Sequence, residues 1–287
     1  MIQAIVTGIL LGGLYALIGV GMSLVFGIMK ITNIAHGDLM ILSAFFTMVF
    51  TRLISGSVIL ALLLSIVVMI IIGALVQKFL INQVIDKGSE PPLLVTFGLS
   101  IIIQNALLLV FGANSNSIST RLNKINILQS NFIAISGQYA LNCAVAIAVI
   151  VALSLIINKT SFGRAIRATS SDVTAAELMG INTKRMYVYA MALTMCATCI
   201  AGLLVGETFV FYPSSGTQYL IIAFGVVVIG GMGSIMGTLL GGLILGLAQL
   251  IGAEIFGVTY ELLIGYIVML IILTIRPQGL LSKKTSR

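Results

Sequence analysis

Nearly the whole chain consists of apolar runs that are close to the length needed to cross a lipid bilayer, separated by short polar segments. A helix needs about 20 apolar residues to span the hydrocarbon core. The runs are continuous and do not alternate with polar residues, which excludes a transmembrane β-barrel. We therefore expect an all-α, polytopic membrane protein with one transmembrane domain over residues 1–287. Candidate spans lie at about 4–29, 35–52, 58–80, 93–112, 138–157, 186–208, 218–233, 235–252 and 258–276.

The charge pattern predicts how this domain sits in the membrane. Charged residues make up 8% of the chain, whereas soluble domains carry about 25%. The net charge of +7 does not indicate nucleic-acid binding, because the basic residues lie in loops and at the C-terminus, where membrane orientation explains them. The most basic stretches, 158–185 and 276–287, are predicted inside. Segment 113–137, with only Arg121 and Lys124, is predicted outside.

This orientation fixes the number of crossings. A C-terminus inside requires two short crossings within 218–252 rather than one long helix, and the glycine-rich connector 230–234 is suited to break them. Counting back places the N-terminus outside and gives nine spans. Eight spans result if one apolar run is re-entrant.

No sequence motif indicates catalysis. The chain lacks a phosphate-binding G-x-x-x-x-G-K-[ST] loop and the H-E-x-x-H and G-x-S-x-G motifs of hydrolases. The three cysteines, Cys143, Cys196 and Cys199, lie inside apolar runs, and no cluster of histidines accompanies them. Small residues at helix contacts explain these cysteines better than a metal site does. We therefore expect no catalytic residues, no metal and no enzyme activity.

Two segments interrupt apolar stretches with little polar linker. They are 26–38 and 228–238, which lie in different halves of the chain. Paired interruptions of this kind are a pointer to the transport pathway of a membrane carrier. The spacing does not say whether the two halves are related by a parallel or an inverted repeat.

The first interruption contains the only histidine, in the sequence Asn33-Ile34-Ala35-His36-Gly37-Asp38. Three interpretations are open. The segment can be a tight cytoplasmic turn in which Asp38 caps the next helix. It can be a helix break that lines a substrate pathway, or a proton relay through His36 and Asp38. The candidate pathway residues here are Asn33, His36, Gly37 and Asp38.

Few other polar groups fall inside the predicted spans. Gln104 and Asn105 interrupt the span 93–112 and are further pathway candidates, although hydrogen bonding between helices also explains them. Glu207 ends the span 186–208 just before an aromatic stretch. It is a candidate for contact with a substrate ammonium or with a protein arriving from outside, or else a solvated helix end. No row of intramembrane carboxylates suggests ion coupling.

The chain contains thirty glycines, and some of them recur at spacings that favour close helix packing. Gly237 and Gly241, and likewise Gly242 and Gly246, are small residues spaced four apart, a pattern that lets helix backbones approach in lipid. This pattern is consistent with an oligomer but does not identify one.

The long polar segment 158–185 calls for a function, since water-facing loops can be much shorter. Its GRAIR sequence is expected to end one span. A short helix is expected over 171–179, with Ser171 or Asp172 as its cap and Gly180 as its stop. Small apolar residues on such a helix suit insertion into a groove of a partner. The alternative is a helix that lies on the lipid headgroups.

Several of these motifs resemble one known family. The segments GRAIRATSSDVTAAELMGIN, GLYALIGVGMSLVFGIMKITNIAHGD, VIGGMGSIMGTLLGGLILG and RPQGLL follow one another in the chain between Gly12 and Leu281. Together they are similar to the branched-chain amino acid ABC transporter permeases, of the smaller of the two types that are commonly paired.

The resemblance implies a function and partners. Such a permease lies in the cytoplasmic (inner) membrane of a prokaryote and usually pairs with a second permease subunit. Two cytoplasmic ATP-binding subunits bind ATP and Mg²⁺, so the chain itself would hold no cofactor, and an extracytoplasmic binding protein delivers the amino acid. The coupling loop that faces the ATPase would be about 158–185, with Arg164, Asp172, Ala176, Glu177 and Gly180.

The substrate stays open at this level. Similar permeases import urea and amides, and specificity in such systems lies largely in the delivering protein. A more distant alternative is an ion-coupled secondary transporter that works alone, for which Asp38 is the one intramembrane candidate. An enzyme embedded in the membrane is disfavoured by the lack of a paired nucleophile and base.

Overall fold

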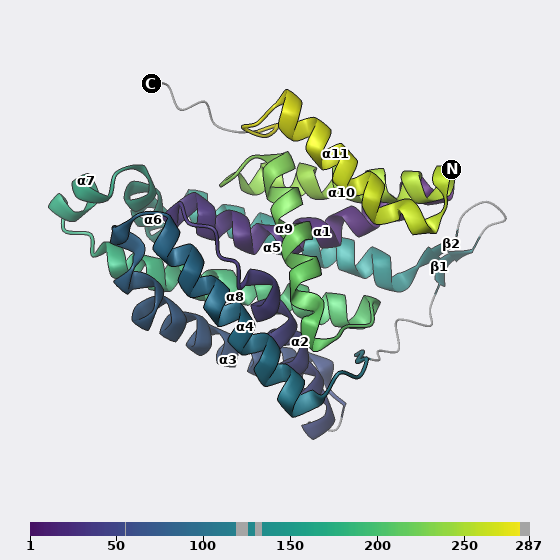
Figure 1. Cartoon of the computed structure of the whole chain (residues 1–287), viewed down its shortest axis with the longest axis horizontal. Helices are drawn as coiled ribbons and strands as arrows, with labels where there is room; N and C mark the ends of the chain where they lie inside the picture. Colours follow the sequence, from purple (N-terminus) through teal and green to yellow (C-terminus); the bar gives the residue numbers. More distant parts are fainter. Residues whose placement is uncertain (55, 119–125, 130–133, 282–287) are drawn as a thin grey trace.

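The computed structural model describes residues 1–54, 56–118, 126–129 and 134–281, in a nearly all-helical bundle (Figure 1). Arg121, Lys124 and the last six residues of the basic tail lie outside the described residues. The α-helices are α1 (Ile2–Met29), α2 (His36–Leu53), α3 (Val58–Phe79), α4 (Glu90–Phe111), α5 (Gly137–Lys159), α6 (Ser161–Ser171), α7 (Val173–Leu178), α8 (Thr183–Thr208), α9 (Gly216–Gly230), α10 (Ile235–Phe256) and α11 (Glu261–Ile275). Short 3-10 helices include η1 (Ile81–Gln83), η2 (Ile85–Lys87), η4 (Pro213–Ser215) and η5 (Val258–Tyr260), and strands β1 (Asn126–Gln129) and β2 (Ala134–Ser136) form an antiparallel hairpin.

The helices are layered around α1. Of the most apolar 18-residue window of α1, 83% of the residues are buried, against 22% for α3 and α4 and 6% for the last span. Helices α3, α4 and α11 expose large apolar side chains, among them Leu109 and Leu263, as expected of surfaces covered by lipid or by another membrane subunit. Eight helices of the described residues are long and apolar enough to cross a membrane. Polytopic membrane architecture is thus confirmed.

The bundle has two ends that differ in charge. Helices α6 and α7 lie at one end, called the α7 end below, and the N-terminus and the β1–β2 hairpin lie at the other, called the hairpin end (Figure 1). Nine of the ten described Lys and Arg residues follow or precede helix ends at the α7 end, and Arg52 is the exception. The positive-inside rule predicts that the α7 end faces the cytoplasm, as expected from the sequence for segment 158–185.

Leaving aside α6 and α7, nine α-helices remain among the described residues, against the eight or nine spans expected from the sequence. Eight of them belong to the apolar spans, and α2 is the ninth helix, outside that set. The break expected at 230–234 is present between α9 and α10. The tail returns to the α7 end, where the amides of Leu280 and Leu281 donate to the carbonyls of Ile229 and Gly230.

The glycine pattern serves packing within this chain. A side-chain carbon at Gly12 would lie 2.6 Å from the Leu243 Cα, and one at Gly246 would lie 2.6 Å from the Gly8 carbonyl oxygen. Helices α1 and α10 therefore meet backbone to backbone. The second pair, Gly237 and Gly241, faces α9 in the same way. The small-residue spacing is explained by the fold of one chain, and no oligomer is needed to account for it.

Two helices begin inside the bundle instead of at its ends. The His36 ring, in the first residue of α2, meets the carbonyl of Ile18. Ile18 lies roughly 16 Å along α1 from the α7 end, at 1.5 Å per residue. Gly216, the first residue of α9, lies against Gly37 and Asp38. The chain thus runs back into the bundle twice through short segments outside the α-helices, over 30–35 and over 209–215.

This arrangement corrects the pairing of interruptions predicted from the sequence. Segment 228–238 is a tight turn at the α7 end, where Gly233 touches Gly27. It is a neighbour of the end of α1 and does not enter the bundle. The true counterpart of the first interruption is 209–215, which pairs through Phe211 with Asn116 by two backbone hydrogen bonds of 2.9 Å. The predicted spans 186–208 and 218–233 leave this segment as a connection, but its apolar and aromatic residues 209–212 do not indicate that it enters the bundle.

Candidate functional site

The break before α2 is held by its own polar groups. Asn33 is fully buried, and its side-chain oxygen accepts a hydrogen bond of 3.0 Å from the amide of Ala35. The amide of Ile34 donates to Thr96 Oγ1 on α4, at 3.2 Å. Lys30 starts the break with a left-handed backbone, φ 55°. Of the three interpretations of this segment, the structure matches a helix break inside the bundle and not a turn at the membrane surface.

Asp38 is the centre of a buried polar cluster. Its Oδ2 accepts a hydrogen bond from the Ser100 hydroxyl at 2.6 Å, and its Oδ1 accepts one from Gln104 Nε2 at 3.0 Å. Asp38 is 1% exposed, and both donors lie on α4. The carboxyl group lies in the first turn of α2 but does not cap it. Its oxygens bind α4 instead, which corrects the expected capping role.

Helix α9 completes this cluster, which we call the Asp38 cluster: Asp38, Ser100, Gln104 and Thr217. Gln104 Nε2 also lies 3.3 Å from Thr217 Oγ1, in the first turn of α9. Gly37 and Gly216 are in backbone contact, so a side chain at either position would collide with the other helix. Both helix N-termini therefore point at one region, and the carboxylate of Asp38 lies where their positive dipole ends meet. Discontinuous helices that meet in this way are typical of substrate pathways in transporters.

The Asp38 cluster reaches the protein surface on one side. Gln104 is half-buried, while Thr217 and its neighbour Gln218 are exposed. Polar side chains at membrane depth are unfavourable against lipid, so this edge is suited to a water-lined pathway or a second subunit. Asn105 points elsewhere, since it is exposed and its amide donates to the Ile101 carbonyl at 2.8 Å. The Gln104–Asn105 pair is therefore split, and only Gln104 joins the cluster.

The only histidine has a separate environment. His36 is 1% exposed, and its Nε2 donates to the Ile18 carbonyl at 3.1 Å, while Asp38 is bound by α4. The two side chains have no hydrogen bond in common among the described residues. A relay of protons from His36 to Asp38 thus has no direct path. The ring packs closely on Gly21, where a side-chain carbon would lie 2.7 Å from His36 Cε1.

A pocket of about 300 Å³ lies on the hairpin side of the same region. It contains one carboxylate, Glu261, among the side chains of Tyr15, Gln218 and Tyr219, and its remaining walls are apolar. Tyr15 is fixed by a buried hydrogen bond of 2.7 Å to Gln249. The sequence analysis assigned no role to Ser100, Thr217, Gln218 or Glu261. Single polar residues within a span or at its start give no periodic signal, so only the tertiary structure brings them together.

Glu207 does not lie on the outer surface. It is 8% exposed, and its Oε2 accepts a hydrogen bond of 2.8 Å from Gln138 on α5. Gln138 is linked on to Asn142, whose amide reaches Thr208 at 2.6 Å. Glu207 therefore joins α5 to α8 inside the bundle. This placement counts against both of its expected roles, as a contact for an arriving protein and as a solvated helix end.

The polar segment 158–185 folds as a helical corner at the α7 end. The GRAIR sequence does not end α5 as expected. Thr160 caps a new helix, α6, by accepting a hydrogen bond from the Gly163 amide at 3.0 Å. Gly163 has no room for a side chain because its Cα faces the last carbonyls of α5. Arg167 also binds one of these carbonyls, that of Ile157.

Helix α7 projects beyond this corner. Asp172 caps it by accepting a hydrogen bond from the Ala175 amide at 3.0 Å, and Gly180 ends it with φ 82°. The amide of Ile181 donates back to the Ala176 carbonyl at 3.0 Å, which completes a Schellman motif. The cap and the stop match the sequence prediction, although the helix, Val173–Leu178, is shorter than expected.

Exposed apolar side chains cover the outer side of α7. Leu178 and Met179 are 84% and 82% exposed, and Val173 is partly exposed. Of the expected coupling residues, Arg164, Asp172, Glu177 and Gly180 are exposed, whereas Ala176 is buried and packs the helix onto its corner. Apolar side chains gathered at the tip of a water-facing helix are typical of a protein-docking surface.

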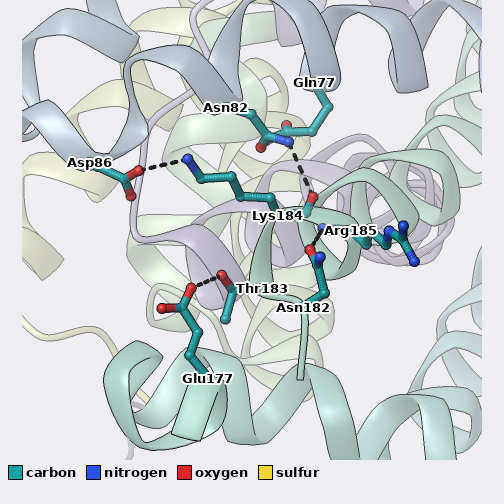
Figure 2. Close-up of polar contacts among 8 residues, drawn as sticks. All are labelled: Gln77, Asn82, Asp86, Glu177, Asn182, Thr183, Lys184 and Arg185. Atoms are coloured by element: carbon teal, nitrogen blue, oxygen red, sulfur yellow. Dashed lines mark hydrogen bonds and ion pairs between the residues drawn. The ribbon is translucent and has the colours of Figure 1, made fainter. Parts of the chain in front are cut away.

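The base of α7 is tied to the membrane helices. Glu177 Oε1 accepts a hydrogen bond of 2.5 Å from the Thr183 hydroxyl, at the start of α8 (Figure 2). Asn182 caps α8 by accepting from the Arg185 amide at 3.0 Å. These contacts connect α7 to the first turn of α8, which runs through the bundle. No group of three or more His, Cys, Asp or Glu residues suited to a metal ion is found in the described part of the chain.

A helical membrane bundle with two helix starts meeting at mid-membrane, and with a projecting cytoplasmic helix, defines a transporter permease. The family model described as "Branched-chain amino acid transport system / permease component" matches residues 4–273. The chain belongs to this family.

Individual relatives agree over almost the full length. The chain is 30% identical to the high-affinity branched-chain amino acid transport system permease protein BraD of Pseudomonas aeruginosa, over 98% of this chain and 96% of the relative. It is 28% identical to the corresponding permease LivH of Escherichia coli K12, with the same coverage. The solved structure of PsaBC from Streptococcus pneumoniae in complex with Fab has a similar fold, with a TM-score of 0.51 and 12% identity, over 96% of this chain and 91% of that chain.

Proposed function

We propose that this chain is the membrane subunit of a binding-protein-dependent ABC importer for branched-chain or other hydrophobic amino acids. The observation that carries the proposal is α7, a helix with an exposed apolar tip that is fixed to α8 by Glu177 and Thr183. Two separate ATP-binding subunits would dock on this tip and supply ATP and Mg²⁺, so that the chain itself holds no cofactor. Their motion would reach the bundle through α8.

The pathway would run along the Asp38 cluster, with a second permease subunit facing it. Thr217 and Gln218 are exposed at the depth where α2 and α9 meet, and an edge of polar side chains in the membrane requires water or protein beside it. A related permease across this edge would enclose the pathway. An extracytoplasmic binding protein would deliver the substrate at the hairpin end, in the cytoplasmic membrane of a prokaryote.

The amino-acid class is supported by the pocket of about 300 Å³ on the hairpin side. Its apolar and aromatic walls, which include Phe209, Ile222 and Leu262, suit a branched aliphatic side chain. The carboxylate of Glu261 would pair with the ammonium group of the amino acid. Urea is neutral, so it has no ammonium group to pair with Glu261, and it has no aliphatic side chain to fill an apolar pocket. The pocket therefore favours an amino acid over the urea and amide alternative.

The test is to disrupt α7 in the complete transporter. Replacing Leu178 and Met179 with Asp should abolish co-purification of the ATP-binding subunits and stop uptake, because two apolar side chains would be removed from a docking groove. Each buried apolar side chain contributes about 1.5–3 kcal/mol. Met232→Asp is the matched control, since Met232 is also an exposed apolar residue at the α7 end but lies in the α9–α10 turn.

Normal uptake by the double variant would contradict the docking role of α7. Transport by the purified chain alone, without ATP, would instead support the ion-coupled carrier. That alternative has little to support it, because Asp38 is already engaged by Ser100 and Gln104.

A further inference from the structure

A basic pocket lies at the α7 end, away from both the Asp38 cluster and the tip of α7. Its volume is about 630 Å³, and it is bounded by the end of α3, by η1 and η2, and by the first turns of α8. Four cationic side chains line it: Lys78, Lys87, Lys184 and Arg185. The one carboxylate in its wall is Asp86. Neither the Asp38 cluster nor α7 accounts for this charge.

Three of the four cations are available to a ligand. Asp86 Oδ2 lies 3.2 Å from Lys184 Nζ, so that carboxylate is already engaged (Figure 2). Among the described residues, no carboxylate lies within ion-pair distance of Lys78, Lys87 or Arg185. The Lys78 ammonium instead lies over the Phe79 ring, 5.1 Å from its centre. Like charges gathered in one pocket repel one another until an anion joins them.

The frame of the pocket is rigid. Asn82, which is largely buried, donates its side-chain amide to the Lys184 carbonyl at 3.1 Å and accepts from Gln77 Nε2 at 2.9 Å (Figure 2). These bonds lock η1 and α3 onto the first turn of α8. Asn182 fixes the same turn from the other side by capping it. The basic side chains are thus presented from a preformed site and not from a loose loop.

The pocket lies at the boundary between apolar surface and water. On α3, the exposed apolar side chains Leu75 and Phe79 lie on either side of Lys78 in the sequence. On α8, exposed Tyr189 follows Arg185 by one turn and packs its ring against Phe162 of α6. An aromatic residue with Lys and Arg just beyond an apolar stripe is the usual arrangement at a membrane interface. A ligand here would meet cations at one end and hydrocarbon at the other.

We propose that this pocket binds the headgroup of an anionic phospholipid from the cytoplasmic leaflet. The phosphodiester would lie among Lys78, Lys87 and Arg185, and the acyl chains would follow Leu75 and Phe79 along α3. Basic pockets between membrane helices on the cytoplasmic side are suited to such headgroups. A soluble acidic protein would use the cations but would leave the apolar stripe without a partner. The same α8 turn also binds α7 through Thr183, so a bound lipid would brace the corner that carries α7.

The test measures lipid preference of the purified full-length chain by native mass spectrometry. The probes are phosphatidylglycerol and phosphatidylcholine with identical acyl chains. Replacing Lys78 and Arg185 with Gln should lower the preference for phosphatidylglycerol about tenfold, since each basic residue near an anionic surface adds to the attraction. The matched control is Lys159→Gln with Arg276→Gln, which removes two exposed charges from the same end outside the pocket.

A second variant guards against misfolding. Asp86→Asn removes the carboxylate that holds Lys184, so it should raise the preference for phosphatidylglycerol, a gain that a damaged protein would not show. The proposal is overturned if both double variants lose the preference equally. It is also overturned if glycerol 3-phosphate at equal concentration displaces the lipid, which would mark a site for free phosphate. Purification of the assembled transporter with the same variant gives a further test: loss of the ATP-binding subunits with unchanged lipid binding would overturn the proposal as well.

Discussion

At the scale of single residues, the Asp38 cluster is the most constrained part of the molecule. Asp38 joins α2 to α4 by two hydrogen bonds and lies against the first residue of α9. A buried carboxyl group with two donors is stable only while both partners are present, since an unsatisfied buried group costs about 1–3 kcal/mol. The cluster therefore fixes the relative positions of three helices at the middle of the proposed pathway.

Asp38→Asn should slow uptake but leave it dependent on ATP. The amide keeps the size of the side chain but replaces one acceptor oxygen with a donor, so one of the bonds from Ser100 and Gln104 is lost. One such bond contributes about 0.5–1.5 kcal/mol, which corresponds to a decrease of up to about tenfold in rate. The measurement is uptake by proteoliposomes with and without ATP. Complete loss of an uptake that never needed ATP would point to ion coupling through Asp38.

His36 and Glu207 show the limit of prediction at this scale. Each is the kind of residue that suggests function when it is met in an apolar sequence. In the structure His36 is bound to the α1 backbone and Glu207 joins α5 to α8. A polar residue in a span has to be satisfied by something, but sequence spacing does not say whether the partner is another helix or a ligand.

At the scale of helices, the contact between α1 and α10 holds the bundle together. Its glycines let the two backbones touch, and α1 is the most buried of the spans. In lipid, this closeness replaces the hydrophobic driving force that packs helices in water. The sequence predicted close approach from the glycine spacing, but the identity of the facing helix came only from the fold.

Replacing Gly12 and Gly242 with Ala should destabilise the folded chain. The added methyl groups would lie 2.6 Å from the Leu243 Cα and 2.5 Å from the Ala16 amide nitrogen, so two backbones would have to move apart. Such overpacking costs about 1–3 kcal/mol per site. Thermal unfolding in detergent is the readout. Gly98→Ala on α4 is the control, because nothing lies within 4 Å of its new methyl group, and an equal loss of stability there would contradict the packing argument.

At the scale of the whole molecule, the α7 end and the side of the bundle formed by α4 and α9 expose different kinds of residue. The α7 end carries α7, the proposed docking helix, and nine of the ten described basic residues. The face formed by α4 and α9 exposes Thr217 and Gln218, whereas the surface near the C-terminal end of α4 exposes Leu109. The first face is suited to the pathway and the second to lipid.

A cysteine at Thr217 should therefore be labelled by a charged, water-soluble thiol reagent in the assembled transporter, and labelling should change when substrate or ATP is added. Leu109→Cys, at a side chain that is 87% exposed, should stay unlabelled because lipid covers it. The readout is the mass shift of the chain after labelling, with the parent chain as background. Equal labelling of the two positions would show that the α4–α9 face does not line a water-filled pathway.

The sequence by itself determined the membrane class, the presence of eight or nine spans, the break between α9 and α10, and the cap and stop of α7, and it predicts the orientation. These features follow from local composition: apolar length, the placement of Lys and Arg, and turn residues such as Asp172 and Gly180. Family membership was also visible in separated motifs, and the comparisons confirmed it.

Only the tertiary structure decided that α2 and α9 begin inside the bundle, which glycines face each other and which polar residues meet. The predicted spans 186–208 and 218–233 already leave a connection at 209–217, but its position inside the bundle depends on the pairing of Phe211 with Asn116 and on the fit of Gly216 against Asp38. The basic pocket likewise combines α3 and η2 with α8, which begins about 100 residues further along the chain. Contacts between distant segments depend on shape and depth in the bundle, and a one-dimensional pattern does not carry that information.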